Sequence, residues 1–435
     1  MKIPGPLKTP PEGVLQPLQL DASALAEVPD ARLHAPVPAS RLHAPVSTSR
    51  LRASQRSGIP PFEVMQITEE IARRRAAGRD VVSLCAGEPS PWAVRGELPA
   101  LGYTGPLGTT ELREAIAGHY REWYDVSIPA ARVAVTTGSS GAFQLAFLTA
   151  FDAGDRVALA SPGYPAYKNI LLALGIEVVE IQAGPETRYQ PTPELLDAAA
   201  RERGDLAGLI LASPANPTGT MLGRAELAAL VDWCRAHGAR LVSDEIYHGI
   251  TYPAPGDPDP RGVSVSEFDP EAIVVNSFSK YWGLTGWRLG WAILPEGLVA
   301  SFEALASNLA LSPPAPAQHL ALGAFAPEVY AERDAVVEGF ARARQLILDA
   351  EPELGWGAAA PSDGAFYYYS DLGPQLERFG DASSYARALL ERADVALVPG
   401  GDFDSIAGHR SVRISYAAGE AAVAEALERI IRFQR

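Results

Sequence analysis

One lysine stands in a stretch that could bind a phosphate group and bond covalently to a carbonyl compound. Lys280 follows the apolar run 272–275, which predicts a buried strand. Ser277 and Ser279 precede this lysine, and Arg288 follows it. Hydroxyl and guanidinium groups donate to phosphate oxygens, and a lysine amine forms an imine with a carbonyl cofactor. A lone lysine at a strand end is more often simply solvated. Here the spacing of the serines and the arginine around Lys280 favours the chemical interpretation instead.

A second candidate for anion binding is the sequence Gly138, Ser139, Ser140, which lies between a predicted strand, 133–137, and a helix. Glycine allows a ligand to approach the backbone closely, and the free N–H groups at a helix N-terminus attract an anion. The sequence matches neither a Walker A loop nor a dinucleotide-binding fingerprint. By itself it would also suit any strand-to-helix turn.

Other polar residues follow further predicted strands. Asn216 comes after the strand 206–212, and Asp244 after the strand 240–243. In an open parallel sheet, ligands bind beyond the carboxyl ends of the strands. We therefore expect Asn216, Asp244 and Lys280 to converge with the glycine-serine turn on one site.

The elements that must position these residues alternate between strand and helix. This alternation predicts an α/β fold whose large domain has a mostly parallel, seven-stranded sheet flanked by helices. Its predicted strands are 133–137, 155–160, 177–181, 206–212, 240–243, 272–275 and 289–294. Beyond Pro313 the pattern predicts a smaller α+β domain. Its predicted helices are 316–347, 383–393 and 420–432, and its predicted strands are 364–369, 395–398 and 411–416.

Four regions follow from this pattern. Residues 1–54 are proline-rich and contain a short tandem repeat, so we expect a disordered extension. Residues 55–84, with a helix at 62–77 and a strand at 81–85, are expected to pack with the small domain. The large domain is predicted at 85–315 and the small C-terminal domain at 316–435.

Composition excludes several functional classes. The net charge of −15 argues against a nucleic-acid-binding surface. Only two cysteines are present, Cys85 and Cys234, and both are expected to be buried thiols. No apolar run is long enough for a transmembrane helix, so we expect a cytoplasmic protein without a membrane partner.

Several motifs together resemble one family. They are the lysine stretch, the sequence Asn-Pro-Thr-Gly at 216–219, and a loop from Tyr103 to Gly108 that precedes Leu-Arg-Glu-Ala at 112–115. Over residues 55–435 the chain resembles the class I and II aminotransferases, which have fold type I and use pyridoxal 5'-phosphate (PLP). The resemblance implies a homodimer with shared active sites.

The resemblance also implies roles around the cofactor. Lys280 would form the resting imine (the internal aldimine) and then act as a general base. Asp244 would keep the pyridine nitrogen protonated, which makes the ring a stronger electron sink. Tyr247 and Asn216 would hydrogen-bond the phenolic oxygen of the ring, and Tyr164 would stack on it. The implied phosphate contacts are Gly138, Ser139, Ser140, Ser277, Ser279, Arg288 and, from the neighbouring subunit, Tyr103.

Substrate binding is implied at three residues. Arg413 would hold the α-carboxylate of an amino acid, although a structural salt bridge also suits an arginine on a strand. Gly87 would bring the backbone near that carboxylate, and Asn216 would contact both cofactor and substrate. No metal ligands are expected.

The resulting prediction is a ping-pong transfer of an amino group from an L-α-amino acid to a 2-oxo acid. A carbon–sulfur β-lyase or a cyclising synthase fits the same lysine stretch. The PLP-binding domain of a transcriptional regulator would need a helix-turn-helix module, which the first 54 residues do not resemble. Trp92 and the aromatic run 366–369 are compatible with an apolar substrate pocket or with core packing, so the amino acid is not identified.

Overall fold

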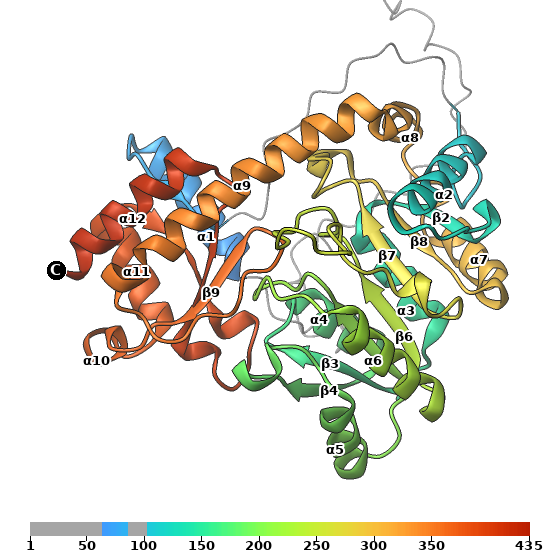
Figure 1. The fold of residues 1–435 in the computed structure, drawn as a ribbon, viewed down its shortest axis with the longest axis horizontal. Coiled ribbons are helices and arrows are strands. Elements are labelled where there is room, and N and C mark those ends of the chain that lie inside the picture. Colours follow the sequence, from blue (N-terminus) through green and yellow to red (C-terminus); the bar gives the residue numbers. More distant parts are fainter. Residues whose placement is uncertain (1–62, 86–101) are drawn as a thin grey trace, which may run out of the picture. The chain divides into compact units, whose positions relative to one another are not determined.

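The computed structural model describes residues 63–85 and 102–435, all within one compact unit, Ser54–Arg435 (Figure 1). The predicted extension 1–54, Gly87 and Trp92 lie outside the described residues. No described helix is long and apolar enough to cross a bilayer.

The central element is the predicted mostly parallel seven-stranded sheet, which is confirmed. Its order is β2-β8-β7-β6-β5-β3-β4, and only β8 runs antiparallel to its neighbours. The strands are β2 (Val133–Thr136), β8 (Gly290–Ile293), β7 (Ile273–Ser277), β6 (Arg240–Asp244), β5 (Gly208–Ala212), β3 (Arg156–Ser161) and β4 (Glu177–Gln182).

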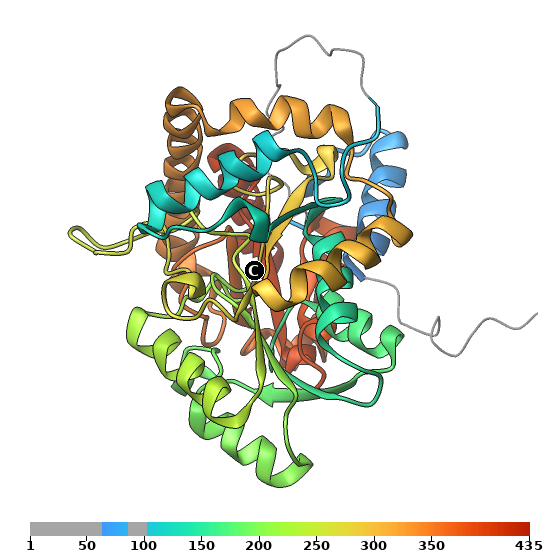
Figure 2. The same ribbon diagram turned by 90° about the vertical axis from the view of Figure 1, so that its right-hand side faces the viewer.

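Helices cover both faces of this sheet (Figure 1, Figure 2). Side chains alternate along β7: Val274 packs in one buried cluster, while Ile273 and Val275 pack in the other. Because both faces are buried, the inner strands such as β5 and β7 are mostly apolar, whereas the edge strand β4 also carries polar residues. One cluster includes residues of α3 (Gly138–Ala150), α4 (Pro165–Leu174) and α7 (Val299–Leu309). The other includes residues of α2 (Thr110–Tyr124), α5 (Pro193–Arg203) and α6 (Arg224–His237).

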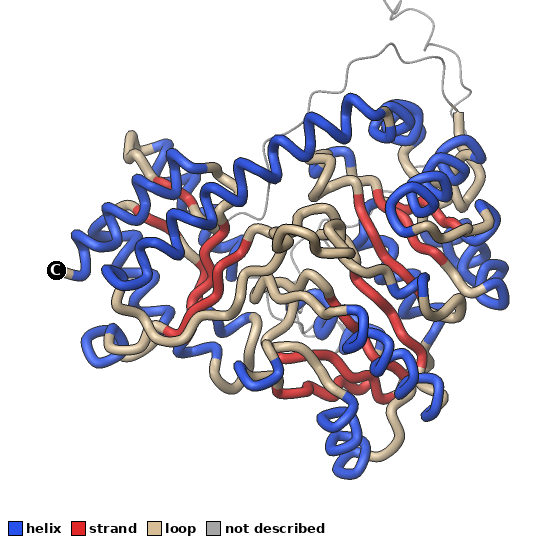
Figure 3. The backbone as a smooth tube through the Cα atoms, in the orientation of Figure 1, coloured by secondary structure: helices blue, strands red, loops and turns tan. Residues whose placement is uncertain are grey.

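The C-terminal part contains a separate antiparallel sheet (Figure 3), with the order β11-β12-β9. Its strands are β9 (Tyr367–Asp371), β11 (Val398–Pro399) and β12 (Ser411–Ser415). The helices of this part are α8 (Ala315–Ala321), α9 (Pro327–Leu354), α10 (Gln375–Phe379), α11 (Ala382–Ala393) and α12 (Glu420–Gln434).

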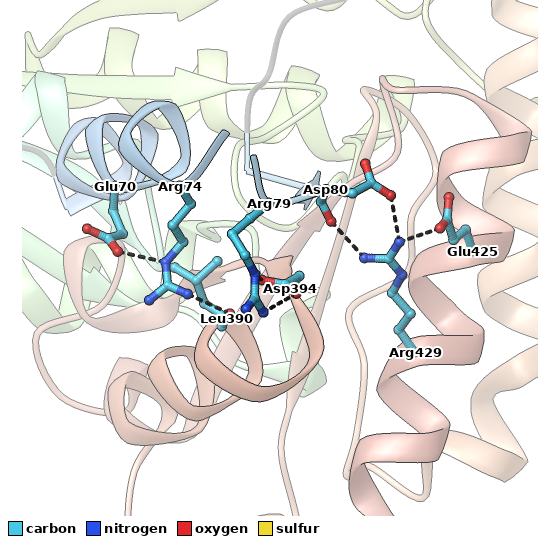
Figure 4. A network of polar contacts seen from close by, with 8 residues as sticks. All are labelled: Glu70, Arg74, Arg79, Asp80, Leu390, Asp394, Glu425 and Arg429. Carbon is cyan, nitrogen blue, oxygen red and sulfur yellow. Dashed lines mark hydrogen bonds and ion pairs between the residues drawn. The ribbon is translucent and has the colours of Figure 1, made fainter. Parts of the chain in front are cut away.

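The segment before the large sheet docks on this C-terminal part. β1 (Val82–Ser83) pairs in parallel with β10 (Val395–Ala396). The helix α1 (Glu63–Ala76) and the turn after it contribute a polar network (Figure 4). In this network Arg79 pairs with Asp394, and Arg429 pairs with Asp80.

Three element predictions were wrong in detail, each for a local reason. The predicted helix 316–347 is interrupted, because Pro327 disfavours helical backbone at Ala326, which is extended at φ −72° and ψ 141°. The predicted strand 364–369 begins only at Tyr367, because Ala365 has a left-handed φ of 56°. The predicted strand 395–398 is divided between two sheets as β10 and β11.

Candidate active site

Lys280 lies in a tight turn that follows β7. The Phe278 N–H donates to the Leu289 carbonyl at 3.1 Å, so the chain folds back at once toward β8. The Lys280 Nζ atom lies 5.8 Å from the ring centroid of Tyr247 and 5.9 Å from that of Phe366. The amine therefore lies near two aromatic rings, one from the segment after β6 and one from the residue before β9.

Asp244 is the last residue of β6 and is only 3% exposed. Its carboxylate accepts hydrogen bonds from the Tyr167 hydroxyl and, at 3.1 Å, from the Ile246 N–H. Burial raises the pKa of Asp244 to about 6, although these hydrogen bonds and the nearby Lys280 charge act in the opposite direction. A cationic partner would lower the cost of burying this carboxylate.

Arg413 reaches this region from β12 and is 4% exposed. Its Nη1 donates to Asn216 Oδ1 at 2.8 Å, and its Nη2 donates to the Cys85 carbonyl at 3.0 Å. The guanidinium carbon lies 4.4 Å from the ring centroid of Tyr367 and 4.8 Å from that of Phe403. Two aromatic rings therefore fix its plane.

Tyr247 and Tyr367 connect the lysine to the arginine. Their hydroxyl oxygens lie 2.8 Å apart, and both side chains are buried. Burial raises the pKa of both phenols, so both are neutral at physiological pH. Each phenol then carries one proton that it can donate.

The glycine-serine turn and Arg288 meet as predicted. Gly138 begins α3 with φ 72°, and a Cβ atom there would lie 2.7 Å from the Arg288 Nη2. A Cβ atom on Gly290 would lie 2.8 Å from the Ser139 backbone nitrogen. A larger residue at Gly138 would collide with the Arg288 guanidinium, and one at Gly290 would collide with the backbone at the start of α3. A cationic group and free N–H groups therefore face one small cradle, which fits a phosphate.

The serines around Lys280 and the turn differ in what they offer. Ser277 Oγ donates to the Leu289 carbonyl at 3.3 Å and accepts from the Ser279 N–H at 3.0 Å. Its single proton is used inside the turn, so the prediction that Ser277 donates to a phosphate has no support here. Ser279 is buried beside it, Ser139 is half-buried and Ser140 is exposed.

Two predicted aromatic residues occupy contrasting positions. Tyr164 is half-buried ahead of α4, with its ring centroid 5.3 Å from that of Tyr167. Tyr103 is 86% exposed, so its side chain packs against little of the described chain.

Sequence reasoning missed several residues that complete the site. Tyr167 could have been found from its position on the helix that Tyr164 precedes. Phe366 and Tyr367 lie in the aromatic run whose role was left open, and both face the site. Phe403 and the Cys85 carbonyl carried no signal, because neither lies near a motif. The side chains of Cys85 and Cys234 are buried, as predicted.

The described residues hold no group of three or more side chains that could bind a metal. The groups that the site does bring together are a lysine, a buried carboxylate, a buried guanidinium and a small cradle at the start of α3.

Comparisons with known proteins agree with this arrangement. Residues 97–430 match the family model described as aminotransferase class I and II. The chain is 45% identical to the valine–pyruvate aminotransferase of Mycobacterium tuberculosis, over 87% of this chain and 97% of that protein. It is 34% identical to the aspartate/prephenate aminotransferase of Thermus thermophilus, over 86% and 96%. The crystal structure of an aminotransferase from Mycobacterium tuberculosis superposes with a TM-score of 0.82 at 45% identity, covering 88% of this chain and 98% of that one. The chain therefore belongs to the aminotransferase class I and II family and is an enzyme of amino-group transfer.

Proposed function

We propose that this enzyme uses PLP to move the amino group of an L-α-amino acid to a 2-oxo acid in a ping-pong reaction. The observation that carries the proposal is the state of Arg413. Among the described residues it forms no ion pair, its two hydrogen-bonded partners are neutral carbonyl oxygens, and its Nε has no hydrogen-bond partner. A buried cation is costly without an anion, and a substrate carboxylate would supply one bidentately. The structural salt bridge considered as an alternative is not found among the described residues.

The residues fit PLP at each of its ends. The cradle of Gly138, Ser139, Ser140 and Arg288, with Ser279, would hold the phosphate. Asp244 would accept a hydrogen bond from the ring nitrogen, and Tyr164 would stack on the ring. When bound, PLP supplies a ring that withdraws electrons from the substrate's α-carbon.

The proton chemistry belongs to the chain itself. Lys280 Nζ would take the proton from the α-carbon and return it to the neighbouring position, as a general base and then an acid. Tyr247 would donate to the phenolic oxygen of the ring, and the Asn216 amide would donate to the same atom while its Oδ1 accepts from Arg413. The aromatic rings of Tyr247 and Phe366 lie 5.8 and 5.9 Å from the amine and would limit where it can move.

For the substrates we propose a small aliphatic amino acid and pyruvate. The support is the 45% identity to a valine–pyruvate aminotransferase, together with the apolar surfaces of Phe366 and Phe403 near Lys280 and Arg413. The backbone at Gly87 would approach the carboxylate, as the family resemblance implies.

For the assembly we propose a homodimer, with Tyr103 of each subunit reaching the phosphate site of the other. Its 86% exposure supports this role. We also propose two domains, residues 85–315 and residues 316–435, and we assign residues 55–84 to the second. Pairing of β1 with β10 supports that attachment.

The test uses the visible spectrum of the full chain loaded with PLP. The sequence contains only four lysines, at positions 2, 8, 168 and 280, so borohydride reduction followed by peptide mapping identifies the attached residue directly. We expect the label on Lys280, its loss in Lys280→Ala, and its retention in the control Lys168→Ala, whose amine pairs with Glu180.

The same spectrum tests the reaction. Valine should convert the bound cofactor to its amine form, and pyruvate should restore the original band. Continuous release of ammonia from an added amino acid, without any 2-oxo acid acceptor, would instead establish a lyase, and an absent PLP band would contradict the proposal.

A further inference from the structure

Tyr367 contacts both Tyr247, which lies near Lys280, and Arg413, which is the proposed carboxylate-binding residue. Its hydroxyl oxygen lies 2.8 Å from that of Tyr247, and its ring lies 4.4 Å from the Arg413 guanidinium carbon. The side chain is only 2% exposed, so neither contact is shared with bulk water. Tyr367 begins β9, and β9 pairs with the strand that carries Arg413.

The backbone around Tyr367 fixes its position from both sides. The Gly364 N–H donates to the Gly219 carbonyl at 2.8 Å, and the Ala365 N–H donates to the Ile250 carbonyl at 2.8 Å. The Ser362 hydroxyl donates to the carbonyl of Tyr367 itself at 2.9 Å. The backbone at Tyr367 is thus held by loops that follow strands of the large sheet and by the segment before β9.

Proton counting sets the direction of the hydrogen bond between the two phenols. A phenol has one proton to donate, and its oxygen can also accept. If Tyr247 donates its proton to the phenolic oxygen of the cofactor, it cannot also donate to Tyr367. Tyr367 must then be the donor between them. A phenol that accepts a hydrogen bond is polarised and becomes a better donor in turn.

We propose that Tyr367 is a positioning residue with two separable functions. Its hydroxyl donates to Tyr247 and so commits the Tyr247 proton to the cofactor, while its ring supports the plane of Arg413 for the substrate carboxylate. This inference rests on the proposed function. The proposed function gives no role to Tyr367. The inference adds one, although Tyr367 acts through Tyr247 and Arg413 and not by contacting the substrate or the cofactor.

Different variants separate the function of the hydroxyl from that of the ring. Tyr367→Phe keeps the ring and removes the donor. Tyr247 then stabilises the ionised ring oxygen less well. A more basic oxygen holds the protonated lysine-linked nitrogen beside it more firmly, so the pKa read from the visible band of the bound cofactor should rise. Tyr247→Phe removes the whole hydrogen bond and should raise the same pKa further.

The first experiment is therefore a double-mutant cycle on that spectroscopic pKa, measured without substrate in PLP-loaded protein. We expect Tyr367→Phe to shift it in the same direction as Tyr247→Phe and by roughly 0.3–1, a fraction of the full hydrogen bond. In the Tyr247→Phe background, adding Tyr367→Phe should have no further effect. Equal effects in both backgrounds, or no shift in either, would overturn the proposal. The matched control is Tyr368→Phe, whose hydroxyl donates to Glu351 at 3.0 Å and faces away from the site.

The second experiment concerns the ring. Tyr367→Leu removes both functions, so the KM of the amino acid should rise about tenfold relative to Tyr367→Phe, corresponding to the loss of a desolvated cation–π contact. An unchanged KM would remove the supporting role of the ring. Thermal unfolding of each variant detects a general loss of structure. Failure of the proposed function is distinguishable, because it would appear as a missing cofactor band in the unmodified protein.

Discussion

The molecule contains two polar networks that both involve an arginine and the segment 63–85, but they differ in their surroundings. In the first (Figure 4), Arg429 pairs with Asp80, whose side chain is 88% exposed, and with Glu425. In the second, Arg413 is 4% exposed and donates to two neutral oxygens, on Asn216 and on Cys85. The first network satisfies its charges internally, whereas the second leaves a buried positive charge without an anion among the described residues.

This difference separates a network that attaches a segment of the chain from one that can bind a ligand. Exposed ion pairs gain little, because water screens both charges and the long side chains lose freedom. Here they connect the segment 63–85 to α12. A buried guanidinium with only neutral partners retains its attraction for a carboxylate, and two aromatic rings hold it ready. Only the second network should therefore control catalysis.

The largest expected effect comes from changing the buried network. Arg413→Lys keeps the charge but loses the bidentate geometry and leaves the Asn216 or Cys85 oxygen without its donor. We expect kcat/KM to fall roughly 30- to 900-fold, mainly because KM rises. This loss corresponds to about 2–4 kcal/mol of transition-state stabilisation.

The matched control for this change is Arg410→Lys. Arg410 lies three residues earlier and is exposed, pairing with Asp371. Its kcat/KM should stay close to that of the unmodified enzyme. Equal losses in the two variants would show that burial does not distinguish the two kinds of arginine.

The pH dependence of cofactor binding should show an intermediate effect. The pKa of Asp244 is raised by burial to about 6 in the cofactor-free chain, so the carboxyl binds a proton below that pH. A protonated carboxyl cannot pair with a cationic ring nitrogen. Affinity for pyridoxamine phosphate should therefore fall by up to about tenfold for each pH unit below 6 and level off above it.

Comparison with Asp244→Asn isolates this contribution, because titration of the ligand phosphate is common to both proteins. We expect the dissociation constant of the unmodified protein, divided by that of Asp244→Asn, to rise by up to about tenfold for each pH unit below 6 and to stay constant between pH 6 and 8. Parallel curves would mean that Asp244 does not titrate against cofactor binding.

The smallest effect belongs to the exposed network. Arg429→Gln removes the contacts with Asp80 and Glu425 and should lower the free energy of unfolding by less than about 1 kcal/mol, and by less still in high salt. Denaturant titration at two salt concentrations measures this, and kcat/KM should be unaffected. A loss of activity comparable to that of Arg413→Lys would mean that the two networks are coupled.

Much of this organisation follows from local sequence. The large sheet was predictable because strands buried on both faces are mostly apolar, and the polar residues at their ends were predictable because parallel strands place them at one edge. The turn at Ala365 and the extended backbone at Ala326 were missed, because the first depends on distant hydrogen bonds and the second on weighing Pro327 against a helical pattern. Phe403 and the Cys85 carbonyl could not be predicted, since their proximity to Arg413 exists only after the small sheet has formed.

The contact between Arg413 and Cys85 has a consequence for how this chain tolerates sequence variation. The guanidinium recognises a main-chain oxygen, and every residue type carries one. Substitution at position 85 by another small residue would leave that oxygen in place, as long as the new side chain fits the buried space. Insertion or deletion of a single residue between β1 and position 85 would present a different carbonyl, or none. At this point the enzyme depends on how many residues precede the site rather than on which residues they are.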